Sequence, residues 1–165
     1  MELVVSDLAA GEVDSLEPLW RQLLVHHSQV APHLAALGAV RAPADSWRLR
    51  RGRYLEWLRE PSARAIVARD GESLLGYAMV RVLADPGTWQ WGDRVGMLET
   101  LVVDAGARRF GVGQILLAAA REHLAGLGIT VMKVDVIAGN DGAVRFYQRE
   151  GALDFEHVLV MPVAE

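Results

Sequence analysis

The sequence predicts a single-domain mixed α/β (α+β) fold, in which helices cover both faces of a mixed sheet. Three observations predict it. The chain has 165 residues, enough for one domain spanning residues 1–165 and too few for two ordinary ones. Apolar residues make up 52% and charged residues 23%, a balance typical of a globular core. The spacing of apolar residues indicates a short strand and two helices, then strands joined by a turn, and then strands that alternate with helices. This gives the order β-α-α-β-β-β-α-β-α-β-β.

The first third of the chain is predicted to form one short strand and two helices. Residues 3–5 are the strand, and residues 44–46 start the second helix, which Pro61 ends. The first helix follows residues 7–11, and its apolar residues recur every three or four positions, as expected of one buried stripe. That stripe consists of Val13, Leu16, Leu19, Trp20, Leu23, Leu24 and His27.

The remainder of the chain is predicted to alternate between strands and helices. An Asp-Gly turn at residues 70–72 joins two strands into a hairpin. A strongly apolar run then predicts a third strand, and Gly126 and Gly128 stop the helix after it. The predicted strands cover residues 63–69, 74–82, 95–103, 130–137, 153–155 and 158–161, and the helices cover residues 111–127 and 141–150.

Composition and charge exclude several classes of site. The chain has no cysteine, which removes disulfides, thiolate zinc sites and cysteine nucleophiles. The net charge of −4 lacks the basic footprint of a nucleic-acid partner. His26 and His27 are adjacent and cannot share a helix face, so we expect no metal. No apolar stretch is long enough for a membrane span or a signal peptide, so we expect a cytoplasmic protein without a membrane partner.

The most informative segment is a buried strand that runs into a turn with two arginines and two glycines and then into a helix. The first N–H groups of a helix lack partners and carry the positive end of its dipole. Gly111 and Gly113 remove side chains that would block close approach, and Arg108 and Arg109 add positive charge. The turn therefore predicts a phosphate or pyrophosphate site, although glycines placed only for backbone conformation would give the same Gly-x-Gly.

Two other nucleotide-binding motifs fit this turn less well. A Walker loop requires Gly-Lys-Ser/Thr, but Val112 follows Gly111. A dinucleotide fingerprint requires a third small residue where this chain has Leu116, although Asp135 follows at about the expected distance. Nicotinamide binding therefore stays open as the weaker alternative.

The sequence resembles the GNAT N-acetyltransferase superfamily in two motifs that lie in order between residues 97 and 155. The first is the Arg/Gln-x-x-Gly-x-Gly/Ala signature at residues 108–113. The second runs from Asn140 through Ala143, Phe146 and Tyr147 to Gly151. Ala105 and Ala152-Leu153 depart from the residues common in the family. The resemblance implies a GNAT-like, mostly antiparallel mixed sheet.

The resemblance also implies acetyl-CoA, or another acyl-CoA, as a co-substrate without a metal. Backbone amides from Arg109 to Gln114 would hold the pyrophosphate, and the strand edge at Leu101 to Val103 would bind the pantetheine arm. Asn140 would contact the same arm, while Phe146 and Tyr147 would line the channel. The full set implied for cofactor binding is Leu101, Val102, Val103, Arg108, Arg109, Phe110, Gly111, Val112, Gly113, Gln114, Asn140, Ala143, Phe146 and Tyr147.

Acyl transfer to an amine requires a base for the amine and benefits from an acid for the leaving thiolate. Tyr147 is the candidate acid because a phenol, with a pKa of about 10, is protonated at neutral pH. It could instead only pack against Phe146. Glu99 is the candidate base because it interrupts an apolar strand, where a carboxylate needs a cleft or a partner. An ion pair with a neighbouring arginine would explain Glu99 equally well.

The function predicted from the sequence is acetyl transfer from acetyl-CoA to a primary amine of a small molecule or protein. A catalytically silent acyl-CoA-binding sensor or scaffold is the alternative. The net acidity mildly favours cationic amines such as polyamines or aminoglycosides. Trp20, Trp47, Tyr54, Trp89 and Trp91 are candidate walls of the acceptor site. The closing strands are able to pair across a homodimer.

Overall fold

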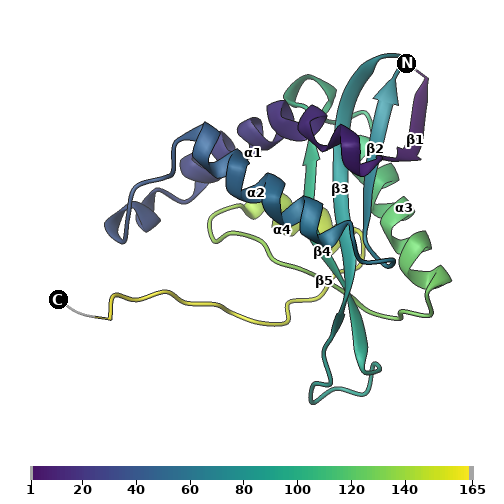
Figure 1. Ribbon diagram of the computed structural model, residues 1–165. Coiled ribbons are helices and arrows are strands. Elements are labelled where there is room, and N and C mark those ends of the chain that lie inside the picture. Colours follow the sequence, from purple (N-terminus) through teal and green to yellow (C-terminus); the bar gives the residue numbers. More distant parts are fainter. Residues whose placement is uncertain (1, 164–165) are drawn as a thin grey trace.

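The computed structural model of the chain describes residues 2–163 and has a five-stranded sheet at its centre (Figure 1). The strands are β1 (Leu3–Asp7), β2 (Arg64–Asp70), β3 (Ser73–Ala84), β4 (Arg94–Val103) and β5 (Met132–Val134). The α-helices are α1 (Glu17–Val30), α2 (Pro43–Trp57), α3 (Val112–Gly126) and α4 (Asp141–Arg149). Three short 3₁₀ segments complete the elements at Ala10–Leu16 (η1), Pro32–Ala36 (η2) and Ala105–Ala107 (η3).

The strands lie in the order β1-β2-β3-β4-β5, so each strand pairs with its neighbour in sequence. The first three pairings are antiparallel, and only β4 and β5 are parallel. This confirms the mixed, mostly antiparallel sheet predicted from the sequence. The sheet is not the mostly parallel, doubly wound sheet in which the dinucleotide fingerprint occurs.

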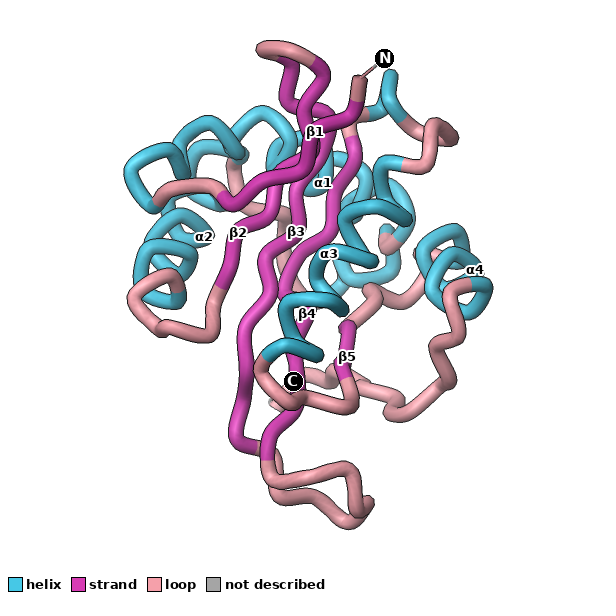
Figure 2. Tube along the Cα trace, turned by 90° about the vertical axis from the view of Figure 1, so that its right-hand side faces the viewer, coloured by secondary structure: helices cyan, strands magenta, loops and turns pink. Residues whose placement is uncertain are grey.

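Helices cover both faces of the sheet and create two apolar cores (Figure 2). On one face α3 packs against the strands through residues three or four positions apart, namely Val112, Leu116, Ala120 and Leu124. On the other face η1, α1 and α2 contribute Val13, Leu16, Leu19, Trp20, Trp47 and Tyr54 to the second core. The sheet therefore separates the start of α3 from the helices α1 and α2.

The close packing of α3 on the sheet depends on a glycine in β3. A Cβ atom at Gly76 would lie 2.7 Å from the carbonyl oxygen of Val102 and 3.1–3.2 Å from side-chain atoms of Leu116 and Val112. These distances leave no room for a side chain. Gly76 thus lets the first turns of α3, and the loop that precedes them, approach the end of β4.

The two closing strands predicted at residues 153–155 and 158–161 do not form. Residues 152–161 adopt no regular secondary structure, and the segment projects away from the body as the yellow trace of Figure 1. A β-propensity run becomes a strand only when another strand is in reach, and no described strand lies beside this one. These apolar runs are therefore extended segments that no strand of the described chain pairs with.

Two other boundaries differ from those predicted. The strand predicted over residues 130–137 is ordered as β5 only at Met132–Val134, because its hydrogen-bonded pairing with β4 stops there. The first helical stripe begins as the 3₁₀ segment η1 before continuing as α1 from Glu17. None of the helices that the structure describes is both long and apolar enough to span a membrane.

Candidate active site

The strands β4 and β5 are hydrogen-bonded over only three residue pairs. Gly96, Met97 and Leu98 pair with Met132, Lys133 and Val134, after which the chain turns away towards α4 (Figure 2). Residues 99–103 of β4 still pair with β3 on the other side. Among the described residues, no strand therefore lies beside the β5-facing edge of residues 99–103, which leaves backbone groups available to an extended ligand.

A β-bulge interrupts β4 at the point where the two strands separate. Met79 pairs with Thr100 and Val80 pairs with Leu98, so Glu99 is the extra residue between them. A bulge bends its strand and redirects the side chain that it carries. The sequence located Glu99 as an unusual charge in an apolar run, but the bulge that orients it follows only from the pairing with β3.

The turn before α3 presents a row of unpaired backbone amides. Ile115 is the first residue of this region whose N–H bonds to the helix backbone, through the carbonyl of Gly111 at 3.0 Å. Among residues 2–163, the amides of Arg109–Gln114 donate to no other backbone or side-chain atom. This is the arrangement of N–H groups and helix dipole that binds phosphate. The predicted anion site therefore has its donors free.

Two residues in this turn have positive φ angles. Gly111, at 80°, is the residue before the first turn of α3, and Arg109 has φ of 72° although it is not glycine. A non-glycine residue in the left-handed region costs free energy, and such strain concentrates at binding sites. Alternating backbone conformations of this kind point successive N–H groups towards one side, as in anion-binding nests.

The second glycine of the motif lies where three elements meet. A Cβ atom on Gly113 would be 3.4 Å from the Phe146 ring of α4 and 3.6 Å from the Val103 side chain of β4. Val112 between the two glycines is buried in the core, so only its amide can face a ligand, whereas Phe110 is exposed. The start of α3, the free end of β4 and α4 thus surround one small region.

Tyr147 lies in α4 next to Phe146, and the two rings meet edge-to-face at 5.1 Å between centroids. Both side chains pack on the core formed by α3 and the sheet. The hydroxyl of Tyr147 makes no hydrogen bond to another residue in the described range. Burial raises the pKa of Tyr147 to about 12, because the phenolate would lose its hydration. The group therefore stays protonated at neutral pH.

Glu99 forms an ion pair, the second of the two interpretations that the sequence allowed. Arg81 of β3 donates from Nε to Glu99 Oε1 at 2.7 Å, and its Nη1 lies 3.3 Å from Glu60 Oε1. The guanidinium also stacks over the Trp57 ring at 4.7 Å. The Glu99 side chain keeps 15% of its surface exposed, so it is paired without being fully buried.

Beside the bulge, three buried hydroxyl groups form a network. Tyr54 of α2 lies 2.6 Å from Thr100 Oγ1 and 3.1 Å from the hydroxyl of Tyr77. Burial raises the pKa of Tyr54 and of Tyr77. The network links α2 by a hydrogen bond to Thr100, the residue of β4 that follows Glu99. Sequence reasoning missed it, since hydroxyl groups at positions 54, 77 and 100 have no shared spacing.

Helix α1 connects the two sides of the gap between β4 and β5. Gln22 donates to Asp104 Oδ2 at 2.8 Å and accepts from the amide of Ala105 at 3.0 Å, both just after β4. One turn later His26 Nε2 lies 3.3 Å from Asn140 Oδ1, which also caps α4 through the amide of Ala143. Asn140, predicted to contact a ligand, is thus also a structural cap. No pattern in the sequence had indicated that Gln22 would make these contacts.

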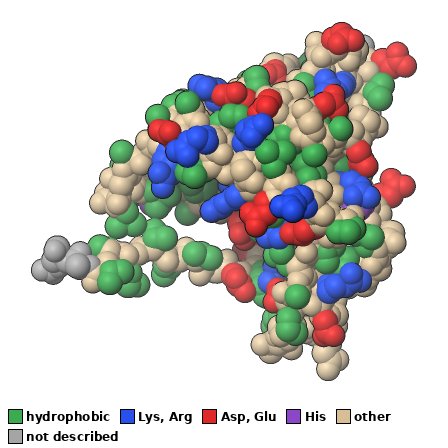
Figure 3. Space-filling model, in the orientation of Figure 1, with side chains coloured by type: hydrophobic (Ala, Val, Ile, Leu, Met, Phe, Trp, Pro, Cys, Tyr) green, Lys and Arg blue, Asp and Glu red, His purple; other side chains and the backbone are tan. Residues whose placement is uncertain are grey.

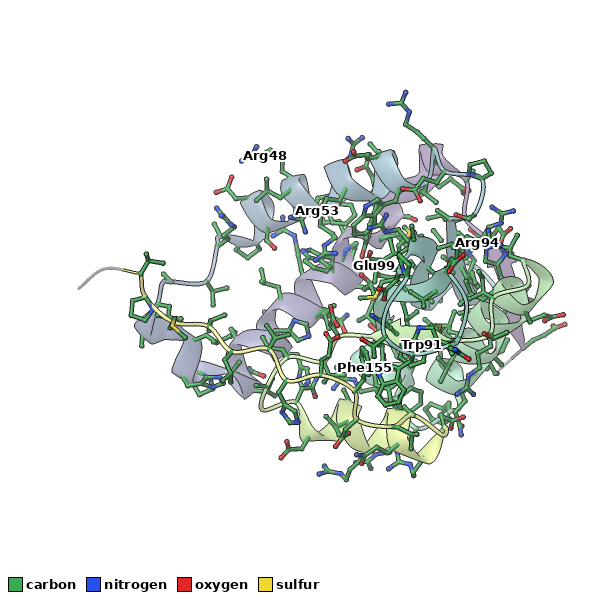
Figure 4. The ribbon with its side chains drawn as sticks, turned by 90° about the horizontal axis from the view of Figure 1, so that it is seen from below. Arg48, Arg53, Trp91, Arg94, Glu99 and Phe155 are labelled. Carbon is green, nitrogen blue, oxygen red and sulfur yellow. The ribbon has the colours of Figure 1, made fainter. Side chains whose placement is uncertain are left out.

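The candidate aromatic residues divide into two groups. Trp20, Trp47 and Tyr54 are core residues and do not form a wall of an open site. Trp89 and Trp91 lie in the β3–β4 loop, and Trp91 meets Phe155 at 5.2 Å between ring centroids (Figure 4). These three rings line a hollow of about 330 Å³ together with Asp85, Lys133 and Glu156.

Lys133 and Asp85 form an ion pair in this hollow. Lys133 pairs with Met97 across β4 and β5, and Met97 pairs with Arg81 across β3 and β4, so the three side chains lie on one face of the sheet. Arg81 holds Glu99 on that face, and a space-filling view shows charged groups gathered where the surface is hollowed above the C-terminal segment (Figure 3). Within residues 2–163 no three His, Asp or Glu side chains come together as a metal site would require.

Comparison with known proteins agrees with this geometry. The sequence profile described as the acetyltransferase (GNAT) family matches residues 30–152, which is more than half of the chain. No curated protein matches the sequence. The solved structure of a GCN5-related N-acetyltransferase from Ralstonia eutropha JMP134 is 20% identical, covers 99% of this chain and 100% of its own, and has a TM-score of 0.75.

Two other solved structures are similar in fold. AAC(6')-Iy in complex with the bisubstrate analogue CoA-S-monomethyl-acetylneamine is 18% identical with a TM-score of 0.72, over 99% of both chains. A transcriptional regulator from Bacillus halodurans C-125 has the same identity and TM-score, over 98% of this chain and 99% of its own. At such identities these likenesses show the fold alone, whereas the profile match shows the family. The chain belongs to the acetyltransferase (GNAT) family.

Proposed function

We propose that this protein is an N-acetyltransferase that moves an acetyl group from acetyl-CoA to a primary amine, with residues 1–165 acting as one domain. The observation that carries the proposal is the free edge of β4 beside a turn with unpaired amides. An extended thioester arm and a diphosphate are the two chemical parts that such an arrangement accepts together. A solved relative of the same fold holds a CoA-containing bisubstrate analogue, which supports the same ligand class here.

The proposed donor site assigns each motif residue to a part of acetyl-CoA. The amides of Arg109 to Gln114 bind the pyrophosphate, and Arg108 and Arg109 add charge at the mouth of the turn. The edge of β4 from Leu101 to Val103 pairs with the pantetheine arm. Residues of and next to α4 complete the channel at Asn140, Ala143, Phe146 and Tyr147.

In the proposed reaction the amine nitrogen attacks the thioester carbonyl, the C–N bond forms and the C–S bond breaks. Glu99 takes the proton that the amine loses, directly or through water. The hydroxyl of Tyr147 donates a hydrogen bond to the sulfur as negative charge develops on it. Because its pKa is about 12, Tyr147 remains a donor throughout the neutral range.

The hollow beside the β3–β4 loop is the proposed entrance for the acceptor. It lies on the same face of the sheet as Glu99, and it offers aromatic rings and the carboxylate of Glu156, whereas the carboxylate of Asp85 is already paired with Lys133. Carboxylates attract an ammonium group, and aromatic faces bind cations. The lining therefore favours a cationic amine, from a small molecule or a protein, over a neutral one.

One observation favours a second candidate, a silent acyl-CoA-binding module. Glu99 is already held by Arg81, so the carboxylate has a structural reason to be present without catalysis. Such a module would bind CoA through the same turn and edge but would release no thiol. The two candidates differ in turnover and not in cofactor affinity.

The test is a screen of acceptor amines with acetyl-CoA, in which released CoA thiol is measured over time. Polyamines, aminoglycosides and peptides with free lysine or N-terminal amines form the panel, and calorimetry measures CoA binding separately. Thiol release that depends on an amine supports the enzyme. CoA binding without release by any amine supports the silent module, and failure to bind CoA overturns both.

A further inference from the structure

Arg50 of α2 is half-buried, and among the described residues its guanidinium has no acidic partner. Other arginines of the same helix are paired, Arg48 with Asp45 and Arg51 with Asp14. Partial burial of a charge costs free energy unless another group compensates for it. The carboxylates of the described chain do not supply that compensation at Arg50.

Three aromatic rings hold the guanidinium of Arg50 in place. Its Cζ atom lies 4.4 Å from the ring centroid of Trp20, 5.7 Å from that of Tyr54 and 5.9 Å from that of Trp57. Aromatic contacts of this kind use the face of the guanidinium and leave the N–H donors along its edge free. Among the described residues, the only fully shielded side-chain nitrogen or oxygen without a partner belongs to Trp91, so the unbonded nitrogens of Arg50 reach solvent.

The guanidinium of Arg50 and the carboxylate of Glu99 belong to one connected group of side chains. The Trp57 ring contacts Arg50 and also lies under the guanidinium of Arg81, at 4.7 Å from its Cζ atom. Arg81 in turn holds the Glu99 carboxylate. Arg50 is therefore separated from the proposed base by one ring and one guanidinium, on the face of the sheet that α2 covers.

Seen from below, Glu99 lies between α2 and the hollow beside the β3–β4 loop (Figure 4). Arg53, which is one helical turn after Arg50, marks α2 on one side of Glu99. Trp91 and Phe155 mark the hollow on the other side. An amine that enters through the hollow and stops at Glu99 would therefore carry the rest of its structure towards Arg50.

We propose that Arg50 binds an anionic group of the acceptor, so that the substrate is an amine that also carries a carboxylate or a phosphate. This inference rests on the proposed acetyl transfer and adds a second point of recognition to it. The edge of a guanidinium donates two parallel N–H bonds to two oxygens of either anion. Because Trp57 and Arg81 separate Arg50 from Glu99, the amine and the anion of the substrate are several bonds apart, as in an ω-amino acid.

The first test compares amines that differ only in the anionic group, with release of CoA thiol as the measurement. For a carboxylate the pairs are δ-aminovalerate with pentylamine and lysine with cadaverine, and for a phosphate the pair is phosphoethanolamine with ethanolamine. Wild-type protein is expected to use the anionic member of at least one pair with a kcat/KM about tenfold or more above that of its partner, the contribution of hydrogen bonds to a charged group.

Arg50→Gln is expected to abolish this preference by raising KM about tenfold for the anionic amine while kcat changes little. Arg48→Gln removes an exposed charge from the same helix and is the matched control, which should keep the preference. Calorimetry with CoA checks that both variants retain the folded donor site. An Arg50→Gln variant that keeps the preference overturns the proposal.

The remaining outcomes separate the anion subsite from acetyl transfer itself. Equal or better use of every amine without an anionic group by the wild-type protein overturns the subsite and leaves acetyl transfer in place. If no amine at all releases thiol, acetyl transfer fails, and calorimetry of the same pairs with the CoA-bound protein decides the subsite. Binding of an anionic member that Arg50→Gln loses then supports the subsite, and the absence of such binding overturns it.

Discussion

The guanidinium of Arg81 lies 2.7 Å from the carboxylate of Glu99, beside the bulge in the pairing of β3 with β4. This contact fixes the orientation of the Glu99 side chain but does not bury it completely, since the side chain is still partly exposed. An acyl-transfer base requires both properties, because its lone pair must be oriented and reachable. The relationship leads directly to the first prediction.

Glu99→Gln is expected to lower kcat by about 10²-fold to 10⁴-fold, as loss of a general base does. Glutamine keeps an oxygen that accepts from Arg81, so the bulge should survive. Stopped assays of amine-dependent thiol release measure kcat, and calorimetry is expected to find CoA affinity unchanged within a factor of two. Unchanged kcat would assign Glu99 a structural role only.

Tyr147→Phe removes one hydroxyl and keeps the ring that packs against Phe146 and the α3 core. We expect kcat to fall by about 10²-fold or more, because the leaving sulfur loses its hydrogen-bond donor. A silent acyl-CoA-binding module would release no thiol with or without the hydroxyl and would keep its affinity for CoA. The comparison uses the same thiol assay, with Tyr54→Phe in the buried network as a control that removes a hydroxyl elsewhere.

Alkaline stability reports on Tyr147 independently of catalysis. A group whose pKa is higher in the folded protein binds more protons when folded. Its contribution to the free energy of unfolding is therefore fully present below the unfolded pKa and is lost as the pH rises above it. For Tyr147 this window runs from pH 10 towards about 12. Wild-type protein should lose about 1 kcal/mol more than Tyr147→Phe between pH 8 and pH 11 in urea titrations. Equal losses would contradict the burial of this phenol.

The proposed diphosphate turn is tested with Gly113→Val. A branched side chain there would meet Phe146 and Val103, closing the space above the free amides. The dissociation constant of CoA, measured by calorimetry, is expected to rise at least about tenfold, which is roughly 1.4 kcal/mol. Gly126→Val at the other end of α3, where nothing lies within 4 Å, should bind CoA like wild type. Equal affinity of both variants for CoA would show that the diphosphate binds somewhere other than this turn.

The packing of α3 on the sheet is tested with Gly76→Ala. The added methyl group would lie 2.7 Å from a backbone oxygen, so the strand or the helix must shift, at a cost of about 1–3 kcal/mol. Gly52→Ala, in an exposed position of α2 with open space around it, should instead stabilise the protein by about 0.5–1 kcal/mol. Chemical denaturation of both variants checks the opposite signs.

Local patterns in the sequence determined much of this protein. The order of elements through α4, the hairpin at residues 70–72, and the glycine turn before α3 all follow from spacing and residue type over short stretches. The free amides at Arg109–Gln114 were predictable for the same reason, since a helix start and its preceding turn are local structure. The resemblance to an acetyltransferase family likewise rested on residues that are near one another in the chain.

The tertiary structure alone decided which side chains meet and where pairing ends. Arg81 and Glu99 are far apart in sequence, and only the register of β3 against β4, with its bulge, brings them together. The early end of β5 and the absence of a partner for residues 158–161 could not be predicted either, because a strand depends on its neighbour and not on its own residues. Pairing across a sheet is a long-range property, and a single sequence shows the propensity for a strand without showing what lies beside it.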